Sequence, residues 1–144
     1  NYPLLPSIEP TEIKLNVVAA LSNSFGQVMF QENIVTGLFF LLAIIVNNKL
    51  MAIYAIYAAA LGSLFGWFIS DISTVNSGLM GYNAILCAIA LTGNKRSDFL
   101  WITVAILIST LSNIGLKTMG LITLTAPFVL STWIVLIFKK YDRK

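Results

Sequence analysis

Two neutral side chains near the start of the chain have the types and spacing to bind a small polar solute. Gln27 and Phe30 are three residues apart, so an α-helix places them on one face. An amide beside an aromatic ring can bind a planar, amide-like molecule through edge hydrogen bonds and face contact. The same residue types also suit an interhelical glutamine hydrogen bond next to a packed phenylalanine, and the pair alone leaves both interpretations open.

A proline near the other end of the chain predicts backbone oxygen atoms that are open to a solute. Pro127 lies within a long apolar segment, and its ring nitrogen cannot donate to the carbonyl of Thr123. The carbonyls of residues 121–125, that of Leu124 included, and the Thr125 hydroxyl would then form a row of uncharged acceptors. The alternative is a proline kink whose freed carbonyl is satisfied by Thr125 and a neighbouring helix.

A glycine motif precedes a short apolar segment in the middle of the chain, Gly78-x-x-Gly81-Tyr82-Asn83. The glycines permit a tight turn, and the N–H groups of the first helical turn after them point back into the protein. Tyr82 then stands at the tip of a helix that enters a membrane without crossing it. The alternative interpretation is that Tyr82 is an aromatic residue at the membrane interface.

The residue types needed for catalysis and for cofactor binding are missing from the sequence. The chain has no histidine and a single cysteine, Cys87, which lies inside an apolar run. A Ser-His or Cys-His pair, a Cys/His zinc site, a His proton relay and a disulfide framework are therefore excluded. Paired carboxylates and a phosphate-binding glycine loop are also absent, and the net charge of +3 is too small to indicate nucleic-acid binding. We predict neither an enzyme nor a protein with a cofactor.

The elements that position these residues are long and almost uncharged. The sequence is 58% hydrophobic and only 10% charged, whereas ordinary soluble domains carry about 25% charged residues. An uncharged apolar run of about 18 residues or more is what a helix needs to cross a lipid bilayer. The sequence therefore predicts an integral membrane protein. Between positions 33 and 138 only six side chains are charged at neutral pH: Lys49, Asp71, Lys95, Arg96, Asp98 and Lys117.

The apolar runs predict an all-α membrane protein with five transmembrane helices and one re-entrant half-helix. The half-helix covers residues 82–91, about 15 Å of helix, or half of a membrane. We interpret residues 71–81 as a loop and residues 93–98 as a charged turn. Three regions follow: an extracellular lead-in at 1–12, a membrane domain at 13–138 and a basic cytoplasmic tail at 139–144. The predicted spanning helices cover residues 13–30, 34–46, 50–70, 99–116 and 120–138.

The distribution of lysine and arginine predicts the orientation of the chain in the membrane. With the C-terminus in the cytoplasm, six basic residues lie inside and three outside, as the positive-inside rule requires. An odd number of spans is what each half of an inverted-repeat transporter needs. The inside set is Lys95, Arg96, Lys139, Lys140, Arg143 and Lys144, and the outside set is Lys14, Lys49 and Lys117.

Three blocks of residues together resemble the urea transporter family. They occur in the order and approximate spacing of that family, from about residue 15 to the C-terminus. The blocks are Gly26-Gln27-Val28 with Glu32-Asn33-x-x-Thr36-Gly37, then Gly78-Leu79-Met80-Gly81-Tyr82-Asn83-Ala84-x-Leu86, then Thr125-Ala126-Pro127-Phe128.

The resemblance implies the second, C-terminal half of a bacterial-type urea transporter. Such a protein has two homologous inverted halves, each with five spans and a re-entrant helix, and forms a homotrimer in the inner membrane. Urea would cross it by facilitated, channel-like diffusion. Because half a pore cannot conduct, we expect the other half to be a separate chain, most simply through cleavage of one precursor. The other option is that two copies of this half pair antiparallel, which conflicts with the one-sided distribution of lysine. Two alternatives remain: a channel for another small neutral solute, such as water, ammonia or a short amide, and a membrane subunit with a scaffold role.

The resemblance also implies roles for individual residues. Gln27 corresponds to the residue that meets urea at one pore site, and Phe30 and Tyr82 correspond to aromatic walls of the urea slot. Thr125, with Leu124 before it, corresponds to the central row of oxygen acceptors. The motif residues that shape this region would be Gly78, Gly81, Asn83, Pro127 and Phe128.

Overall fold

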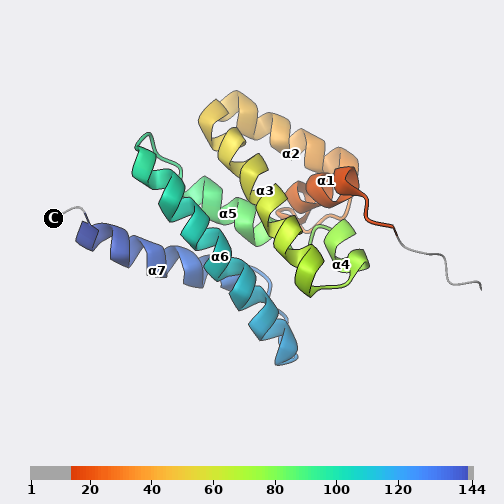
Figure 1. Ribbon diagram of the computed structural model, residues 1–144. Coiled ribbons are helices and arrows are strands. Elements are labelled where there is room, and N and C mark those ends of the chain that lie inside the picture. Colours follow the sequence, from red (N-terminus) through yellow and green to blue (C-terminus); the bar gives the residue numbers. More distant parts are fainter. Residues whose placement is uncertain (1–13, 143–144) are drawn as a thin grey trace, which may run out of the picture.

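The computed structural model describes residues 14–142, and within this range every regular element is a helix (Figure 1). The all-α prediction is therefore confirmed for the described residues. The predicted lead-in at 1–12 and the last two residues of the predicted tail lie outside them. The helices are α1 (Val17–Gln27), α2 (Ile34–Asn47), α3 (Lys49–Ile69), α4 (Ile72–Asn76), α5 (Tyr82–Leu91), α6 (Arg96–Thr118) and α7 (Ala126–Asp142).

Asparagine side chains fix where the first three helices begin. The Oδ1 atom of Asn16 accepts a hydrogen bond from the N–H of Ala19 at 3.0 Å. Asn33 caps α2 through the N–H of Val35 at 2.8 Å, and Asn48 caps α3 through the N–H of Leu50 at 2.9 Å. Asparagine is among the best N-cap residues because its oxygen satisfies an N–H that has no partner within the helix. These caps place α2 and α3 within one residue of their predicted bounds.

The loop predicted for residues 71–81 is wrong in part, because it contains the short helix α4. Asp71 is the N-cap, and its carboxylate accepts from the N–H of Thr74 at 3.0 Å and from the Thr74 hydroxyl at 2.7 Å. The hydroxyl of Ser73 donates to the same oxygen. These bonds, that of Ser73 first, hold the pKa of Asp71 well below its usual range.

The start of the last predicted helix, at residue 120, is also wrong. Helix α7 begins at Ala126, so Pro127 lies in its first turn, where a missing N–H costs no helical hydrogen bond. The carbonyl of Thr123 accepts from the N–H of Ala126 at 3.0 Å, so the prediction of an unpaired carbonyl there fails. At its other end α7 continues to Asp142, which places Lys139 inside the helix rather than after it.

Small residues let α3 lie close against the central helix α5, which α6 and α7 also contact (Figure 1). A Cβ atom added at Gly62 would lie 2.9 Å from the carbonyl oxygen of Met80, and one at Gly66 only 2.5 Å from the Met80 side chain. Close approach of backbones through small residues is how helices associate in lipid. The buried small residues of α3 are Ala52, Ala55, Ala58, Ala59, Gly62, Ser63 and Gly66.

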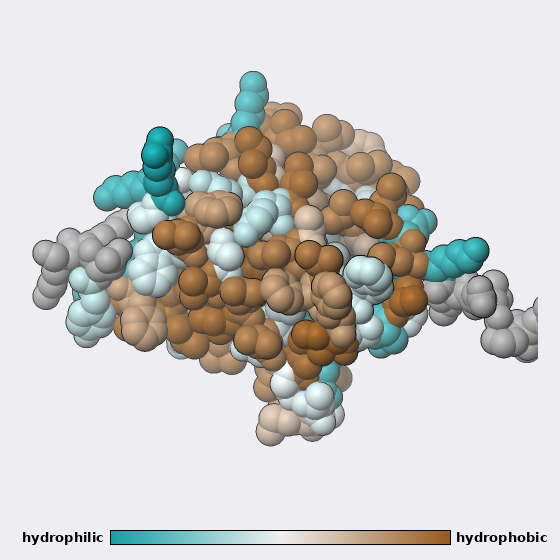
Figure 2. Space-filling model, viewed as in Figure 1, coloured by the Kyte–Doolittle hydropathy of each residue, from teal (hydrophilic) through white to brown (hydrophobic). Residues whose placement is uncertain are grey.

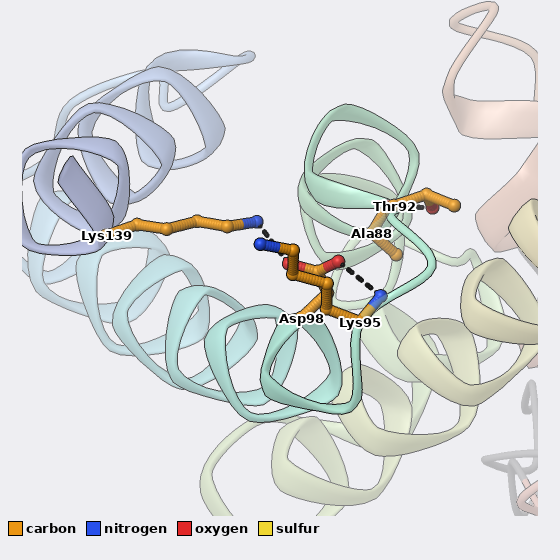
Figure 3. A network of polar contacts seen from close by, with 5 residues as sticks. All are labelled: Ala88, Thr92, Lys95, Asp98 and Lys139. Carbon is orange, nitrogen blue, oxygen red and sulfur yellow. Dashed lines mark hydrogen bonds and ion pairs between the residues drawn. The ribbon is translucent and has the colours of Figure 1, made fainter. Parts of the chain in front are cut away.

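A buried ion pair joins α7 to the start of α6 (Figure 3). The ammonium of Lys139 lies 2.6 Å from Oδ1 of Asp98, whose side chain is only 3% exposed. The other carboxylate oxygen accepts from the N–H of Lys95 at 3.0 Å. A Cβ added at Gly93 would lie 2.2 Å from that oxygen, so the turn before α6 needs glycine to make room for the carboxylate. This cluster fixes one end of α6 and α7 together.

The face of the molecule seen in Figure 2 is largely apolar. Helices α3 and α6 are long and apolar enough to cross a membrane, at about 32 and 35 Å. Large side chains such as Phe39, Val46 and Phe68 are 69%, 88% and 73% exposed, which a soluble monomer of this size would rarely tolerate over such an area. Helices α1 and α2 are shorter, about 16 and 21 Å. The count of five spans therefore stays a prediction.

Candidate functional site

A cavity of about 330 Å³ lies where three distant parts of the chain meet: the end of α1, the start of α5 and the segment between α6 and α7. It brings together four of the five residues predicted to contact a solute, and the fifth, Thr125, follows directly after one of them. The lining residues are Gln27, Phe30, Leu79, Tyr82, Lys117, Leu121, Ile122, Thr123 and Leu124.

The amide of Gln27 both lines the cavity and holds the neighbouring loop. Its Nε2 atom donates to the carbonyl oxygen of Ser77, just after α4, at 3.0 Å. A structural glutamine bond, as in one of the two interpretations from sequence, is therefore present, but its partner lies in a loop and not in another helix. It does not remove the amide from the cavity, because Gln27 remains among the lining residues. The amide is thus fixed in place at the cavity wall.

Phe30 reaches the cavity through an unusual backbone conformation. Helix α1 ends at Gln27, and Phe30 has a φ of +55°, in the left-handed region that favours glycine. Its side chain is 65% exposed, so it is not the packed phenylalanine of the alternative interpretation. Left-handed backbone at a non-glycine residue costs about 1 kcal/mol or more and persists only where the surroundings impose it. Such residues are concentrated at functional sites, which makes this turn a candidate.

Two side chains from the start of α5 hold one carbonyl of the opposite segment. The hydroxyl of Tyr82 and the Nδ2 atom of Asn83 both donate to the carbonyl oxygen of Leu124, the second bond at 3.0 Å. Leu124 also has a positive φ, +39°. Tyr82 is only 5% exposed, so it lies inside the protein at the tip of α5. These bonds fix the non-helical segment that forms one wall of the cavity.

Gly78 sets the turn that delivers Tyr82 to this position. Its φ is +80°, and a Cβ there would lie 2.3 Å from the backbone of Asn23 and Ser24 in α1. The N–H of Tyr82 donates to the Gly78 carbonyl at 3.3 Å. At Gly81 a Cβ would lie 2.2 Å from the Ser24 hydroxyl oxygen. Both glycines are therefore required by close contact with α1.

The remaining predicted residues lie behind the cavity wall rather than on it. Pro127 is buried in the first turn of α7, and Phe128 packs against the core between α5, α6 and α7. Thr125 is half-buried, and its carbonyl accepts from the N–H of Val129 at 3.1 Å. The Leu124 carbonyl already accepts hydrogen bonds from Tyr82 and Asn83. A row of open oxygen atoms in this segment therefore stays a prediction.

The sequence of this chain is similar to those of known membrane transport proteins. Residues 4–140 match the urea transporter family. The chain belongs to the urea transporter family. Urea transporter 1 of Rattus norvegicus is 32% identical to it over 91 residues, which cover 62% of this chain and 24% of that protein. The present chain thus spans about a quarter of the length of that relative.

Membership in the urea transporter family has two direct consequences. The family consists of integral membrane proteins, which explains the apolar outer surface. It is also a family of transport proteins and not of enzymes, as the missing catalytic residues predict.

Sequence reasoning missed several lining residues of this urea transporter chain. Thr123 lines the cavity although Thr125 was the predicted threonine, and Lys117 lines it although its position suggested only a membrane interface. The signal for Thr123 was its place inside the 121–125 segment. For Lys117 no signal exists, because its proximity to Gln27 and Tyr82 depends on how the end of α6 packs.

Proposed function

We propose that this chain forms half of a channel through which urea crosses a membrane by facilitated diffusion. The observation that carries the proposal is the cavity in which the Gln27 amide, the Tyr82 hydroxyl and the Phe30 ring come together in a chain of the urea transporter family. Urea is planar and neutral, with N–H donors at its edge and a carbonyl acceptor. Amide and hydroxyl groups can exchange hydrogen bonds with it without the strong attraction of a charge, so the solute can leave again.

The second part of the proposal is that another homologous half completes the pore. The cavity residues Phe30 and Ile122 are 65% and 87% exposed, as expected of a wall that a second half covers. Helix α5 has 10 residues, about 15 Å, which suits a re-entrant helix that stops near the middle of the membrane. Two inverted halves, each with five spans, would place two such helices on opposite sides of one pore.

We also infer the orientation and the assembly. The excess of lysine and arginine at one end supports a cytoplasmic C-terminus. A bacterial inner membrane as the location rests on the family resemblance alone. The family resemblance supports a trimer of complete subunits, each with its own pore. Detection of a second homologous half in the purified assembly, on the same polypeptide or on another, would support the two-half pore, and an assembly without one would contradict it.

The transport proposal is tested by stopped-flow light scattering of vesicles that contain the native assembly, under an inward urea gradient. We expect urea entry well above that of empty vesicles. Gln27→Leu and Thr123→Val should each slow it about five-fold, the cost of roughly one hydrogen bond to the solute. Leu136→Ala, on the exposed face of α7 away from the cavity, is the matched control and should change little.

Each alternative predicts a different result. If urea entry equals that of empty vesicles, the chain is not a urea channel, and water or ammonia gradients in the same vesicles test the other neutral solutes. If the apolar variants at the cavity leave urea entry intact while the fold persists, the cavity is not on the pathway. Thr125→Val belongs in the same series, because slower flux there and not at Thr123 would restore the predicted row of acceptors.

A further inference from the structure

Lys117 is the one charged side chain among the described residues that line the cavity. It lies in the last turn of α6, and it also borders an adjoining groove. The other side chains of that groove are uncharged: Ile69, Ser70, Met80, Ile114 and Thr118. Lys117 is thus an exposed lining residue that carries a positive charge, whereas the other polar groups of the cavity lining are neutral.

Among the side chains that the structure describes, no carboxylate lies within 4.0 Å of the Lys117 ammonium, and the ion pair found among them joins Lys139 to Asp98. The nearest acidic residue in sequence to the groove is Asp71, one residue after Ser70, and the structure shows no ion pair between its carboxylate and Lys117. The charge of Lys117 is thus not cancelled by a neighbouring carboxylate.

The carbonyl groups at the end of α6 do not cancel the charge either, because they are satisfied locally. The N–H of Leu121 donates to the Leu116 carbonyl at 3.1 Å, and that of Gly120 to the Lys117 carbonyl at 3.0 Å. With a φ of +74° at Gly120, this is a Schellman motif. The Thr118 hydroxyl donates a hydrogen bond to the Gly115 carbonyl oxygen at 2.7 Å. The helix end therefore offers the cavity few free acceptors for a cation.

We propose that Lys117 determines specificity by excluding cationic solutes from this cavity. The inference rests on the proposed function, and it concerns the charge of the solute rather than its shape. Guanidinium is planar and close to urea in size, and it carries a positive charge. The neutral groups of the cavity would accept it by shape and hydrogen bonding, whereas the ammonium of Lys117 repels it.

The test uses the native assembly in phosphatidylcholine vesicles, which carry no net charge of their own. The measured quantity is the guanidinium concentration that halves urea entry in each variant, relative to that variant's own rate without guanidinium. We compare the wild type with Lys117→Met, which removes the charge, and with Lys117→Arg, which retains it. Removal of one charge in a partly aqueous site should lower the half-inhibiting concentration about five-fold, and the arginine variant should resemble the wild type.

Salt provides a second readout that a merely structural role would not move. Raising the ionic strength from about 0.01 to 0.15 M shortens the screening length from about 30 to 8 Å. The half-inhibiting concentration of guanidinium should then fall for the wild type and for Lys117→Arg, and stay constant for Lys117→Met. This comparison within the wild type remains decisive if the methionine variant does not fold.

The outcomes separate the two proposals. Equal half-inhibiting concentrations in wild type and Lys117→Met, or no effect of salt on the wild type, would overturn the role of Lys117 and leave urea transport standing. Vesicles without urea entry in the wild type would overturn the proposed function, and the role of Lys117 with it.

Discussion

The two glycines with positive φ permit a sharp test of how the cavity is built. Gly78, with a φ of +80°, precedes α5, and Gly120, with a φ of +74°, follows α6. Their backbone conformations are nearly the same, but their surroundings differ. A Cβ at Gly78 would lie 2.3 Å from backbone atoms of Asn23 and Ser24, whereas a Cβ at Gly120 would meet nothing within 4 Å. Alanine at either position therefore adds the same backbone strain but a very different contact.

The expected costs follow from these two contributions. Left-handed backbone costs a non-glycine residue about 1–2 kcal/mol, partly offset by the lower entropy of the unfolded alanine chain, so Gly120→Ala should lose about 1 kcal/mol. Gly78→Ala carries the same strain, and overpacking adds about 1–3 kcal/mol, because the contacted atoms are backbone and cannot rotate away. The free energy of unfolding should therefore fall two to four times as far for Gly78→Ala as for Gly120→Ala.

Thermal unfolding in detergent, followed by circular dichroism, measures the difference. For a chain of this size 1 kcal/mol corresponds to about 2–4 °C in Tm, so we expect a loss of about 3 °C for Gly120→Ala and 6 °C or more for Gly78→Ala. Urea entry should fall further for Gly78→Ala, because the turn carries Ser77, the partner of Gln27. Equal losses of stability in the two variants would refute the claim that contact with α1 fixes this turn.

Three further perturbations test other parts of the structure. Tyr82→Phe should lower the free energy of unfolding by about 1 kcal/mol, because Asn83 still donates to the shared carbonyl; an unchanged denaturation midpoint would count against the Tyr82 bond. Lys139→Met should lower the free energy of unfolding by about 2 kcal/mol, since it removes the charged hydrogen bond of the Lys139 ammonium to the buried Asp98 carboxylate, and adding Asp98→Asn should recover part of that loss in the same denaturation assay. Asp71→Ala removes the cap of α4 and should lower the free energy of unfolding. Because folding lowers the pKa of Asp71, the stabilisation by this carboxylate is present above the usual pKa of aspartate and is lost as the pH falls below that value. A difference in unfolding free energy between wild type and variant that grows on acidification would contradict this.

The helices whose bounds were predicted well are those whose ends are marked by residues next to them in the sequence. The bounds of α5 are those expected, because glycines precede it and Thr92-Gly93 follow it, and both ends are set by neighbours in the chain. The limits of α2 and α3 follow from capping by Asn33 and Asn48. The prediction failed for α4, because its five residues, three of them polar, are too few to show a periodic pattern. The decisive feature there is the Asp71 cap, which serves a single turn.

The start of α7 shows why an apolar run alone is a poor guide to a helix end. Residues 120–125 are as apolar as the helix that follows, so hydropathy extends the helix through them. The chain instead leaves α6 at the left-handed Gly120 and enters α7 only at Ala126, next to Pro127. Both residues are boundary signals, a glycine after one helix and a proline in the first turn of the next. The interpretation of Pro127 as a kink overlooked the second of these.

This boundary also explains which part of the candidate site was predictable. Gln27, Phe30 and Tyr82 lie at helix ends that local signals mark, and the structure brings them to one cavity. The opposite wall is a six-residue segment with no repeating backbone hydrogen bonds, so the side chains that face the cavity depend on tertiary contacts. The Leu124 carbonyl is held by Tyr82 and Asn83, which fixes the register of the segment. In that register Thr123 lines the cavity, and Thr125 begins the approach to α7. A helix through this segment would have placed them differently, so the comparison of Thr123→Val with Thr125→Val tests the irregular backbone itself.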